Sequence, residues 1–450
     1  MERGARVLRA VASVLMLTAC TSSKPARDSL SLVVDSSGES PTMRLSAALN
    51  VASGGQLQAE LLQPDLKVHS PDLGDIADVT ELSDGRILVL NRRDRTLVSV
   101  SPGGELGAAL TRPGDGPGEL GVPYAIEQVG QTVIVLQEIP VGGTLTALRL
   151  DGRAPLGRRP PVAGDWASMT QRGPNVLLDF PTQSGIEDWS RRLLRLTDST
   201  FIVGVRDEAP PLGVTDTTYA AADSFRFLRF DTALTLRDTL ATLIAPRSYF
   251  TTQGSEGQPP RVGESLYSSR PILATGDTWY ALGHGDSASI SIVFPARGQR
   301  VNIVWPSEER PVRETDKLQA AHWASVYTAR AFTDARDQFE AMSAVKRREA
   351  EKLYLGFLQF AEKAPEISAA YGTGKCLWLS GFSAGDFFDG TGSTWVGINV
   401  VEGRLVAVVK LPGIDQRIRH VGRHGFYTKQ FDDDDDAVLV RYPMPAHADC

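Results

Sequence analysis

The stretch Asp84–Leu106 reads DGRILVLNRRDRTLVSVSPGGEL and decides the fold class. It holds two short runs rich in Val, Ile and Leu, at 87–90 and 96–100, each bounded by Gly, Pro, Asp or Asn. Apolar runs of this length between turn residues predict β-strands joined by tight turns. The chain also contains 42 Gly and 27 Pro, which favours many tight connections and few long helices. We therefore expect an all-β fold.

Groups of strand-like runs recur along the chain at a spacing of about 40 to 50 residues, the length of one four-stranded β-propeller blade. Such units fit residues 78–112, 124–158, 270–306 and 367–412, a stretched unit begins near Asp165, and a short last unit fits 417–442. The sequence thus predicts six blades, or seven if residues 165–245 divide into two. The last unit is one strand short. A strand within residues 42–69 could complete it and hide its sheet edge.

One segment departs from the β pattern. Glu314 to Ala364 is rich in Ala, Lys, Glu, Gln and Arg and lacks Pro. Its apolar residues recur at helical spacing, among them Trp323, Val345 and Leu353, which predicts two helices forming a hairpin within 313–364. Their apolar stripe is expected to pack on the rim of the propeller. The alternatives are a lid over one end of the ring or a surface for a partner.

Several places in the chain resemble known propeller repeats. Residues 84–106 are similar to an NHL-type repeat, and Arg112 to Leu120 resembles the Gly-rich loop between blades of six-bladed propellers found among exported bacterial lipoproteins. The resemblance covers most of residues 75–442 but is strong only at these stretches and near the C-terminus. It implies a six-bladed fold and an exported location. Such propellers bind very different ligands, so no ligand is implied.

The first twenty residues resemble a bacterial lipoprotein signal. Three Arg precede an apolar stretch from Ala10 to Leu17, which is too short to span a bilayer, and Leu17-Thr18-Ala19-Cys20 follows it. We expect residues 1–19 to be a signal peptide, Cys20 to carry lipid, and residues 20–41 to be a tether. The propeller would then occupy 42–442 and a tail 443–450. An ordinary signal peptide with an incidental Cys20 is the alternative.

Charge and cysteine content limit the classes of partner and of cysteine site that the chain can have. The formal net charge is −7, and residues 1–19 contribute three Arg and one Glu, so the mature chain would carry −7 − 2 = −9. An acidic chain without clustered Lys and Arg is not typical of a nucleic-acid binder. The remaining cysteines, Cys376 and Cys450, can pair in an oxidising compartment or remain two thiols. No Cys-x-x-Cys occurs, which argues against a structural zinc site.

Four short patterns invite a chemical interpretation, and each is better explained by structure. Gly114-x-Gly116-x-Gly118 has no helix after it, so we expect a turn between blades rather than a phosphate loop. Residues 381–385 match Gly-x-Ser-x-Gly around Ser383, followed by Asp415 and by His420 or His424, but a hairpin is expected there instead of a nucleophile elbow. On that hairpin His420 and His424 would not pair as ligands. The run Asp432 to Asp436 is expected to be a solvated loop, because successive strand residues point to opposite faces.

The sequence therefore predicts a lipid-anchored β-propeller at the bacterial cell envelope that binds a protein or a small molecule. No catalytic residue, cofactor or metal ligand is assigned. The alternative is a lactonase- or hydrolase-type six-bladed propeller, whose resemblance would imply a divalent metal held by Glu, Asn and Asp of the inner strands. No such set is evident in the sequence. Whether the chain catalyses a reaction stays open, and a binding role is favoured.

Overall fold

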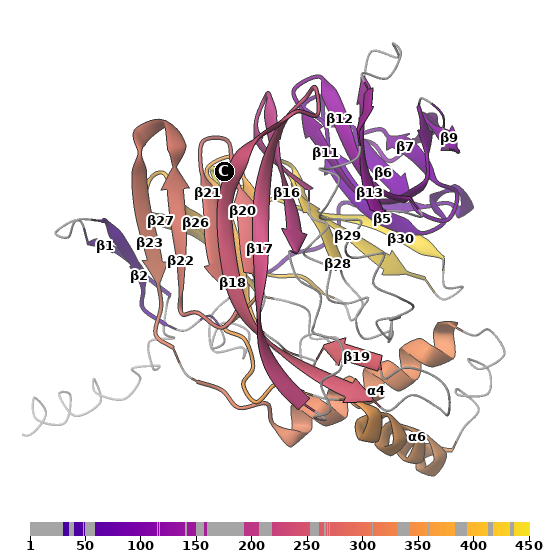
Figure 1. Ribbon diagram of the computed structural model, residues 1–450, viewed down its shortest axis with the longest axis vertical. Helices are drawn as coiled ribbons and strands as arrows, with labels where there is room; N and C mark the ends of the chain where they lie inside the picture. Colours follow the sequence, from indigo (N-terminus) through magenta and orange to yellow (C-terminus); the bar gives the residue numbers. More distant parts are fainter. Residues whose placement is uncertain are drawn as a thin grey trace, which may run out of the picture.

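Six small sheets follow one another around a common axis in the computed structural model (Figure 1). The structure describes residues 30–450 apart from 50–58, 150–156, 160–192, 207–217, 253–260, 332–342, 383–393 and gaps of one to four residues. The inner strands β5, β11, β15, β20, β24 and β28 are neighbours in that order, and β28 lies beside β5 again. The chain is therefore a six-bladed β-propeller, as the repeat spacing predicted.

Each blade is an antiparallel sheet, and its members run from the ring axis outward. Blade 1 is β5 (Ile76–Glu81), β6 (Ile87–Asn91), β7 (Thr96–Val100) and β8 (Leu106–Ala109). Blade 2 is β11 (Val122–Val129), β12 (Thr132–Ile139), β13 (Gly142–Arg149) and β14 (Gly157–Arg159), and the small pair β9 (Arg112–Pro113) and β10 (Glu119–Leu120) lies between the two. All five residues of β6 are buried, because a strand between two blades contacts apolar surface on both faces.

Blade 3 is a single sheet, so the possibility of a seventh blade is excluded for the described residues. It contains β15 (Leu193–Thr197), β16 (Thr200–Arg206), β17 (Thr218–Asp231), β18 (Leu236–Thr252) and β19 (Arg261–Glu264). The start near Asp165 lies outside the described residues. The stretched spacing reflects long strands, because β17 has 14 residues and β18 has 17. Their hairpin extends beyond the ring toward the helices (Figure 1).

The other three blades follow the predicted boundaries closely. Blade 4 is β20 (Pro271–Thr275), β21 (Tyr280–His284), β22 (Ser289–Phe294) and β23 (Gln299–Val304). Blade 5 is β24 (Ile367–Thr373), β25 (Cys376–Gly381), β26 (Thr394–Asn399) and β27 (Arg404–Lys410), joined by β3 (Glu60–Leu61). Blade 6 is β28 (Arg417–Val421), β29 (Gly425–Phe431) and β30 (Ala437–Pro443).

A strand from near the N-terminus completes blade 6, as the sequence predicted. β4 (Leu66–His69) pairs antiparallel with β30, in the register Val438↔His69 to Arg441↔Leu66. Leu66 and Val68 are buried against the blade, and Arg441 pairs with Asp65 at 2.9 Å. The ring is thus closed by joining the two ends of the propeller sequence, and β4 covers the outer edge of β30.

The folded part of the chain begins earlier in the sequence than expected. β1 (Leu32–Asp35) pairs with β2 (Thr42–Leu45), and β2 pairs parallel with β23, so this hairpin adds to the outer edge of blade 4. Residues 32–35 were expected to belong to the tether. Instead, Leu-Val-Val has high β-propensity, and these residues form a strand at the outer edge of blade 4. Cys20 and the expected signal peptide lie outside the described residues.

The helical insertion lies between blades 4 and 5. α4 (Glu314–Ala331) and α6 (Ala344–Phe357) pack together, and His322 Nδ1 lies 2.6 Å from Glu351 Oε1. An antiparallel bridge between Pro311 and Lys363 joins the two ends of the insertion. The expected apolar stripe is partly wrong, because Val345 and Leu353 are 65% and 62% exposed. Helical spacing shows which residues share a face, but not which face meets the rim.

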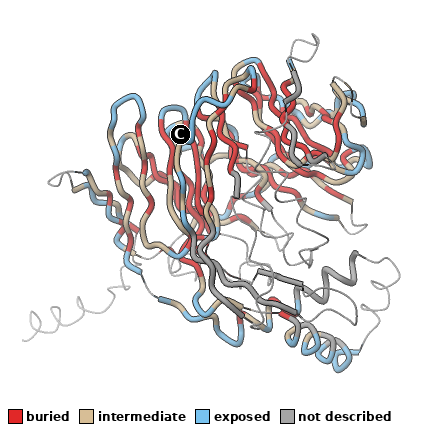
Figure 2. The backbone as a smooth tube through the Cα atoms, in the orientation of Figure 1, coloured by how far each residue is buried: buried red, intermediate tan, exposed pale blue. Residues whose placement is uncertain are grey.

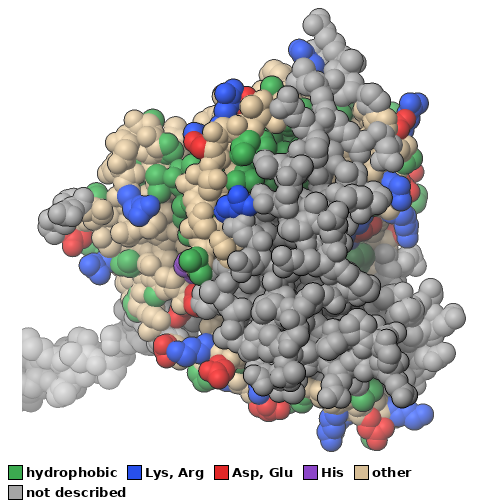
Figure 3. Space-filling model, viewed as in Figure 1, with side chains coloured by type: hydrophobic (Ala, Val, Ile, Leu, Met, Phe, Trp, Pro, Cys, Tyr) green, Lys and Arg blue, Asp and Glu red, His purple; other side chains and the backbone are tan. Residues whose placement is uncertain are grey.

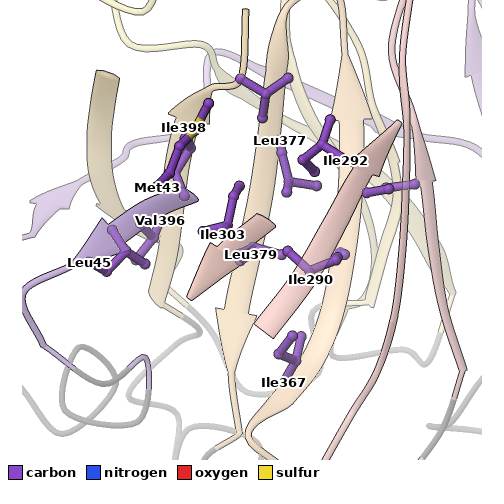
Figure 4. Close-up of a cluster of buried hydrophobic side chains, with 14 of the residues drawn as sticks. Met43, Leu45, Ile290, Ile292, Ile303, Ile367, Leu377, Leu379, Val396 and Ile398 are labelled. Carbon is purple, nitrogen blue, oxygen red and sulfur yellow. The ribbon is translucent and has the colours of Figure 1, made fainter. Parts of the chain in front are cut away.

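The apolar clusters join adjacent blades, and the buried residues follow the strands of the blades (Figure 2). The largest apolar cluster joins blades 4 and 5, where Ile290 and Ile292 face Leu377 and Leu379, and Met43 of β2 covers its outer side (Figure 4). Face-to-face packing of this kind buries both surfaces of most strands. The blades therefore stabilise one another only while the ring stays closed.

The C-terminus is fixed to blade 5. Cys376, the first residue of β25, and Cys450 form a disulfide with a Cα–Cα distance of 5.1 Å, which closes a loop across 74 positions. Lys375 N–H donates to the Cys450 carbonyl at 2.8 Å. Gly374 has φ +53°, and a Cβ there would come 2.0 Å from that carbonyl oxygen, so only glycine fits. The tail 443–450 is therefore part of the folded domain.

Candidate functional site

The two ends of the ring differ in what covers them. Inner strands of a propeller run in the same direction, so the segments that enter them lie at one end. The helical insertion enters β24 there, and Tyr267, just before β20, packs against Ala321 of α4 and against Phe382, which follows β25. We call this end, with the insertion and the extended β17–β18 hairpin, the insertion end. Acidic and basic side chains alternate along its outer surface over the helices (Figure 3).

A charged cluster lies at the insertion end, where the chain enters β5. Asp75 forms an ion pair with Lys429 of β29, whose side chain is only 9% exposed. Burial alone would raise the pKa of the Asp75 carboxyl, but Lys429, Arg92 and Arg419 hold it below its ordinary value. Lys429 contacts the carboxylate, and the charges of Arg92 and Arg419 also act on it, in a chain that is acidic overall.

Arg92 is held in place by its surroundings. Its guanidinium lies 5.0 Å from the centre of the Tyr124 ring, within the range of a cation–π contact. The preceding residue, Asn91, is fully buried; its amide donates to the Asp72 carbonyl at 2.9 Å and its oxygen accepts from Asp75 N–H at 3.3 Å. The Arg92 Nε is buried and has no hydrogen-bond partner among the described residues.

The opposite end of the ring carries a different set of polar contacts. The Glu81 carboxylate, with a side chain 4% exposed, accepts from His424 Nδ1 at 2.5 Å and from the Tyr427 hydroxyl at 2.9 Å. Burial and the Glu81 carboxylate together raise the pKa of the Tyr427 hydroxyl above its ordinary value. This cluster links blade 1 to blade 6. It is therefore a structural contact of the ring closure.

Similar contacts link the neighbouring blades on this side. The Thr80 hydroxyl donates to Glu127 Oε1 at 3.2 Å and joins blades 1 and 2, and Arg195 joins blade 3 to blade 4 through Asp277 at 2.8 Å. Blades 4 and 5 are joined by Trp279, whose indole N–H donates to the Gly374 carbonyl at 3.1 Å. Polar groups at this end of the ring therefore link consecutive blades around the axis.

Glu127 is the titratable member of this series. Burial raises the pKa of its carboxyl to about 7, although Arg195 and hydrogen bonds from Gln128 N–H and the Thr80 hydroxyl lower it. In the unfolded chain the same carboxyl titrates near 4.5. Between these two pH values the folded protein binds more protons than the unfolded chain, so stability falls as the pH rises through this window.

We expect Glu127→Gln to be more stable than the wild type at pH 8 and similar to it at pH 4.5. The amide keeps an acceptor for Thr80 without a buried charge, and the gain at pH 8 is at most about 3 kcal/mol. Urea unfolding at both pH values measures it. Glu105→Gln is the control, because Glu105 is exposed. A variant that shows no gain at pH 8 would contradict the burial of this charge.

A third cluster lies at the outer edge of blade 6. His69 Nε2, at the end of β4, is 2.7 Å from Asp432 Oδ2 and 3.7 Å from Asp436 Oδ2. The run was expected to be a solvated loop with successive side chains on opposite faces, but the side chains at its two ends face the same imidazole. Residues 432 and 436 lie between β29 and β30 rather than along a strand, and Asp436 N–H donates to Asp432 Oδ1 at 2.9 Å, which turns both carboxylates to one side.

The other sequence patterns fall where structure explains them. In the Gly-rich loop Gly116 N–H donates to the Glu119 carboxylate at 2.7 Å, and strand β11 follows instead of a helix, so the loop is a turn between blades. His420 lies on β28, packed near the Tyr427 ring, and His424 is bonded to Glu81, so they do not form a ligand pair. Ser383 and Asp415 lie outside the described residues.

The sequence interpretation missed the clusters around Asp75 and His69. Each combines residues from blade 1 or the N-terminal strand with residues more than 340 positions later, so no local motif marks them. The only signal was the position of Asp75 and Arg92 directly before and after predicted strands. Turn residues of adjacent strands converge at one end of a ring.

Comparisons with known proteins identify no relative by sequence. No family model matches the chain, and no curated protein matches it. Solved structures match it only at low similarity: an exported protein of Bacteroides fragilis (10% identity, 86% of this chain and 94% of that chain, TM-score 0.38), a DUF4221-family member of Bacteroides vulgatus (8%, 85% and 97%, 0.43) and virginiamycin B lyase of Staphylococcus aureus (8%, 84% and 99%, 0.33). No functional conclusion follows from likeness at this level.

Among the described residues, no helix is long and apolar enough to cross a membrane.

Proposed function

We propose that this chain is an extracytoplasmic binding module, held at the bacterial cell envelope by lipid on Cys20, that binds an anionic ligand at the insertion end. The location rests on the N-terminal sequence, in which Cys20 directly follows a short apolar stretch. The ligand class rests on the cluster around Asp75. A carboxylate or phosphate is the group that Arg92, Lys429 and Arg419 together would attract.

The observation that carries this proposal is the environment of Arg92. Its guanidinium is positioned against Tyr124, and its Nε lacks a partner among the described residues. Two further cations, Lys429 and Arg419, act with it on the Asp75 carboxylate. A guanidinium pre-oriented on an aromatic ring loses little side-chain entropy on binding. The helices and the β17–β18 extension lie at the same end and would contribute walls around a bound molecule.

The lactonase-type alternative gains no support from the described residues. Their one group of three metal-ligating side chains, His69, Asp432 and Asp436, lies at the outer edge of blade 6. The metal of such an enzyme would lie among the inner strands.

Thermal unfolding with simple anions tests the proposal. Inorganic phosphate and citrate should raise the melting temperature saturably, compared with chloride at equal ionic strength, because a ligand at 100 times its Kd stabilises by about 2.7 kcal/mol. Arg92→Gln should abolish this rise. Arg93→Gln is the matched control, because Arg93 is the exposed neighbour and should leave the response intact. An equal response in both variants would refute the site.

A further inference from the structure

A side-chain cluster at the seam of the ring meets the requirements of a metal site. His69 is the last residue of β4, the strand that closes the ring, whereas Asp432 and Asp436 border the loop between β29 and β30 of the blade that β4 completes. One ligand atom from each lies within 4.8 Å of the other two. The three side chains meet only because the ring is closed, since 363 residues separate His69 from Asp432.

We propose that His69, Asp432 and Asp436 bind one divalent transition-metal ion, with Zn²⁺ as the best fit, and that this ion fastens the closing strand to blade 6. Imidazole nitrogen and carboxylate oxygen are ordinary zinc ligands at about 2.0–2.2 Å. An imidazole in the set favours zinc over calcium, magnesium and manganese, which suit oxygen ligands. Three protein ligands leave a fourth position for water.

The distances fit with small adjustments. Two ligands bound to one ion at about 2.1 Å lie roughly 3.4 Å apart in a tetrahedral arrangement. The His69 Nε2 to Asp436 Oδ2 distance of 3.7 Å is close to this value, and that to Asp432 Oδ2, 2.7 Å, must lengthen. Both movements are open to these side chains, because His69 is 53% exposed, Asp436 45% and Asp432 25%.

Neighbouring bonds orient the ligands toward one another. Asp432 Oδ1 accepts the Asp436 backbone N–H at 2.9 Å, which leaves Oδ2 facing the imidazole. Asp432 N–H donates to the Asp436 carbonyl at 3.1 Å, so the two ends of the loop are held together. Outer bonds of this kind fix ligand orientation in metal sites.

An ion bound at this site would stabilise the closed ring. It would join β4 to the β29–β30 loop directly, in addition to the four residue pairs between β4 and β30. Binding to the closed ring, but not to the unfolded chain, stabilises the closed ring by mass action. The stability of the propeller would then depend on the metal content of its compartment. This inference does not depend on the proposed anion site, which lies nearer the ring axis.

The test uses the full chain, stripped with a chelator and titrated with Zn²⁺, Mn²⁺ or Ca²⁺. We expect one Zn²⁺ per chain by native mass spectrometry, a saturable rise of about 2–4 °C in melting temperature, and slower amide exchange in 65–69. His69→Ala and Asp436→Asn should each remove all three effects. His447→Ala should keep them, because His447 is an exposed histidine of the tail.

Failure of the site has a distinct signature. No rise with Zn²⁺, or the same rise and stoichiometry in Asp436→Asn as in the wild type, would overturn the proposal. Asp436→Asn is nearly isosteric and lies on an exposed loop end, so it tests the site even if His69→Ala disturbs β4. Loss of binding only in His447→Ala would place the ion on the tail instead.

Discussion

A chain that lacks residues 1–70 should lose its cooperative unfolding transition. The deletion removes β4, so β30 loses four paired residues, Leu66 and Val68 leave the core, and Arg441 loses Asp65. Blade 6 would then expose the edge of β30. The contacts that Glu81 makes between blades 1 and 6 would also lose the support that β4 gives to blade 6. Circular dichroism during heating, with the disulfide intact, measures the transition.

Two shorter deletions separate the causes. A chain lacking residues 1–29 should unfold as the full chain does, because the described fold begins at Leu30. A chain lacking residues 1–59 loses the β1–β2 hairpin, including the buried Met43 and Leu45, but keeps β4. We expect it to be less stable and still to show one transition. If the 1–70 and 1–59 deletions behave alike, closure by β4 is not essential.

Trp279→Ala should lower the free energy of unfolding by about 3–5 kcal/mol, the range for removal of a large buried aromatic side chain. Trp279 is fully buried in the cluster between blades 4 and 5, and its indole N–H bonds to the Gly374 carbonyl. The fit is close: a Cβ on Gly276 would come 2.2 Å from the indole nitrogen, and one on Gly372 would come 2.9 Å from the ring. The cavity cannot collapse without moving both blades.

Trp279→Phe is the matched variant. It keeps an aromatic ring and loses the indole hydrogen bond, while the Gly374 carbonyl still accepts from Asp277 N–H at 2.9 Å. We therefore expect a loss of about 1–2 kcal/mol, from one lost hydrogen bond and a smaller buried ring. Urea unfolding gives both values from the midpoint and the slope. A loss below about 1 kcal/mol for Trp279→Ala would show that blades 4 and 5 are not packed through this side chain.

The architecture could be predicted because each blade appears in the sequence as a local pattern of short strands and turn residues. Blade strands such as 87–91 combine β-branched residues with turn residues at both ends, and their spacing predicted blades 1, 2, 4, 5 and 6 to within a few residues. The missing strand of blade 6 was predicted by counting, since a propeller needs its edge covered. Blade 3 was ambiguous, because 14- and 17-residue strands occupy the length of a further blade.

The candidate sites were not predictable because they depend on contacts between distant residues. Asp75 meets Lys429, and His69 meets Asp432, only after the N-terminal strand joins blade 6. The pattern of Asp432 to Asp436 by itself predicts a solvated loop. Likewise helical spacing grouped Val345 with Leu353, but their exposure is set by how the insertion meets the ring. Sequence patterns show the periodicity within a segment, whereas these sites form only when the ring closes.

Amide hydrogen exchange in residues 65–69 tests the closed ring most directly. Because β4 pairs with β30 and Asp65 N–H donates to the Arg441 carbonyl at 3.0 Å, the bonded amides of this segment should exchange as slowly as those of β29 and β30. Exchange within seconds in 65–69, with β29 and β30 still protected, would contradict closure of the propeller by its N-terminal strand.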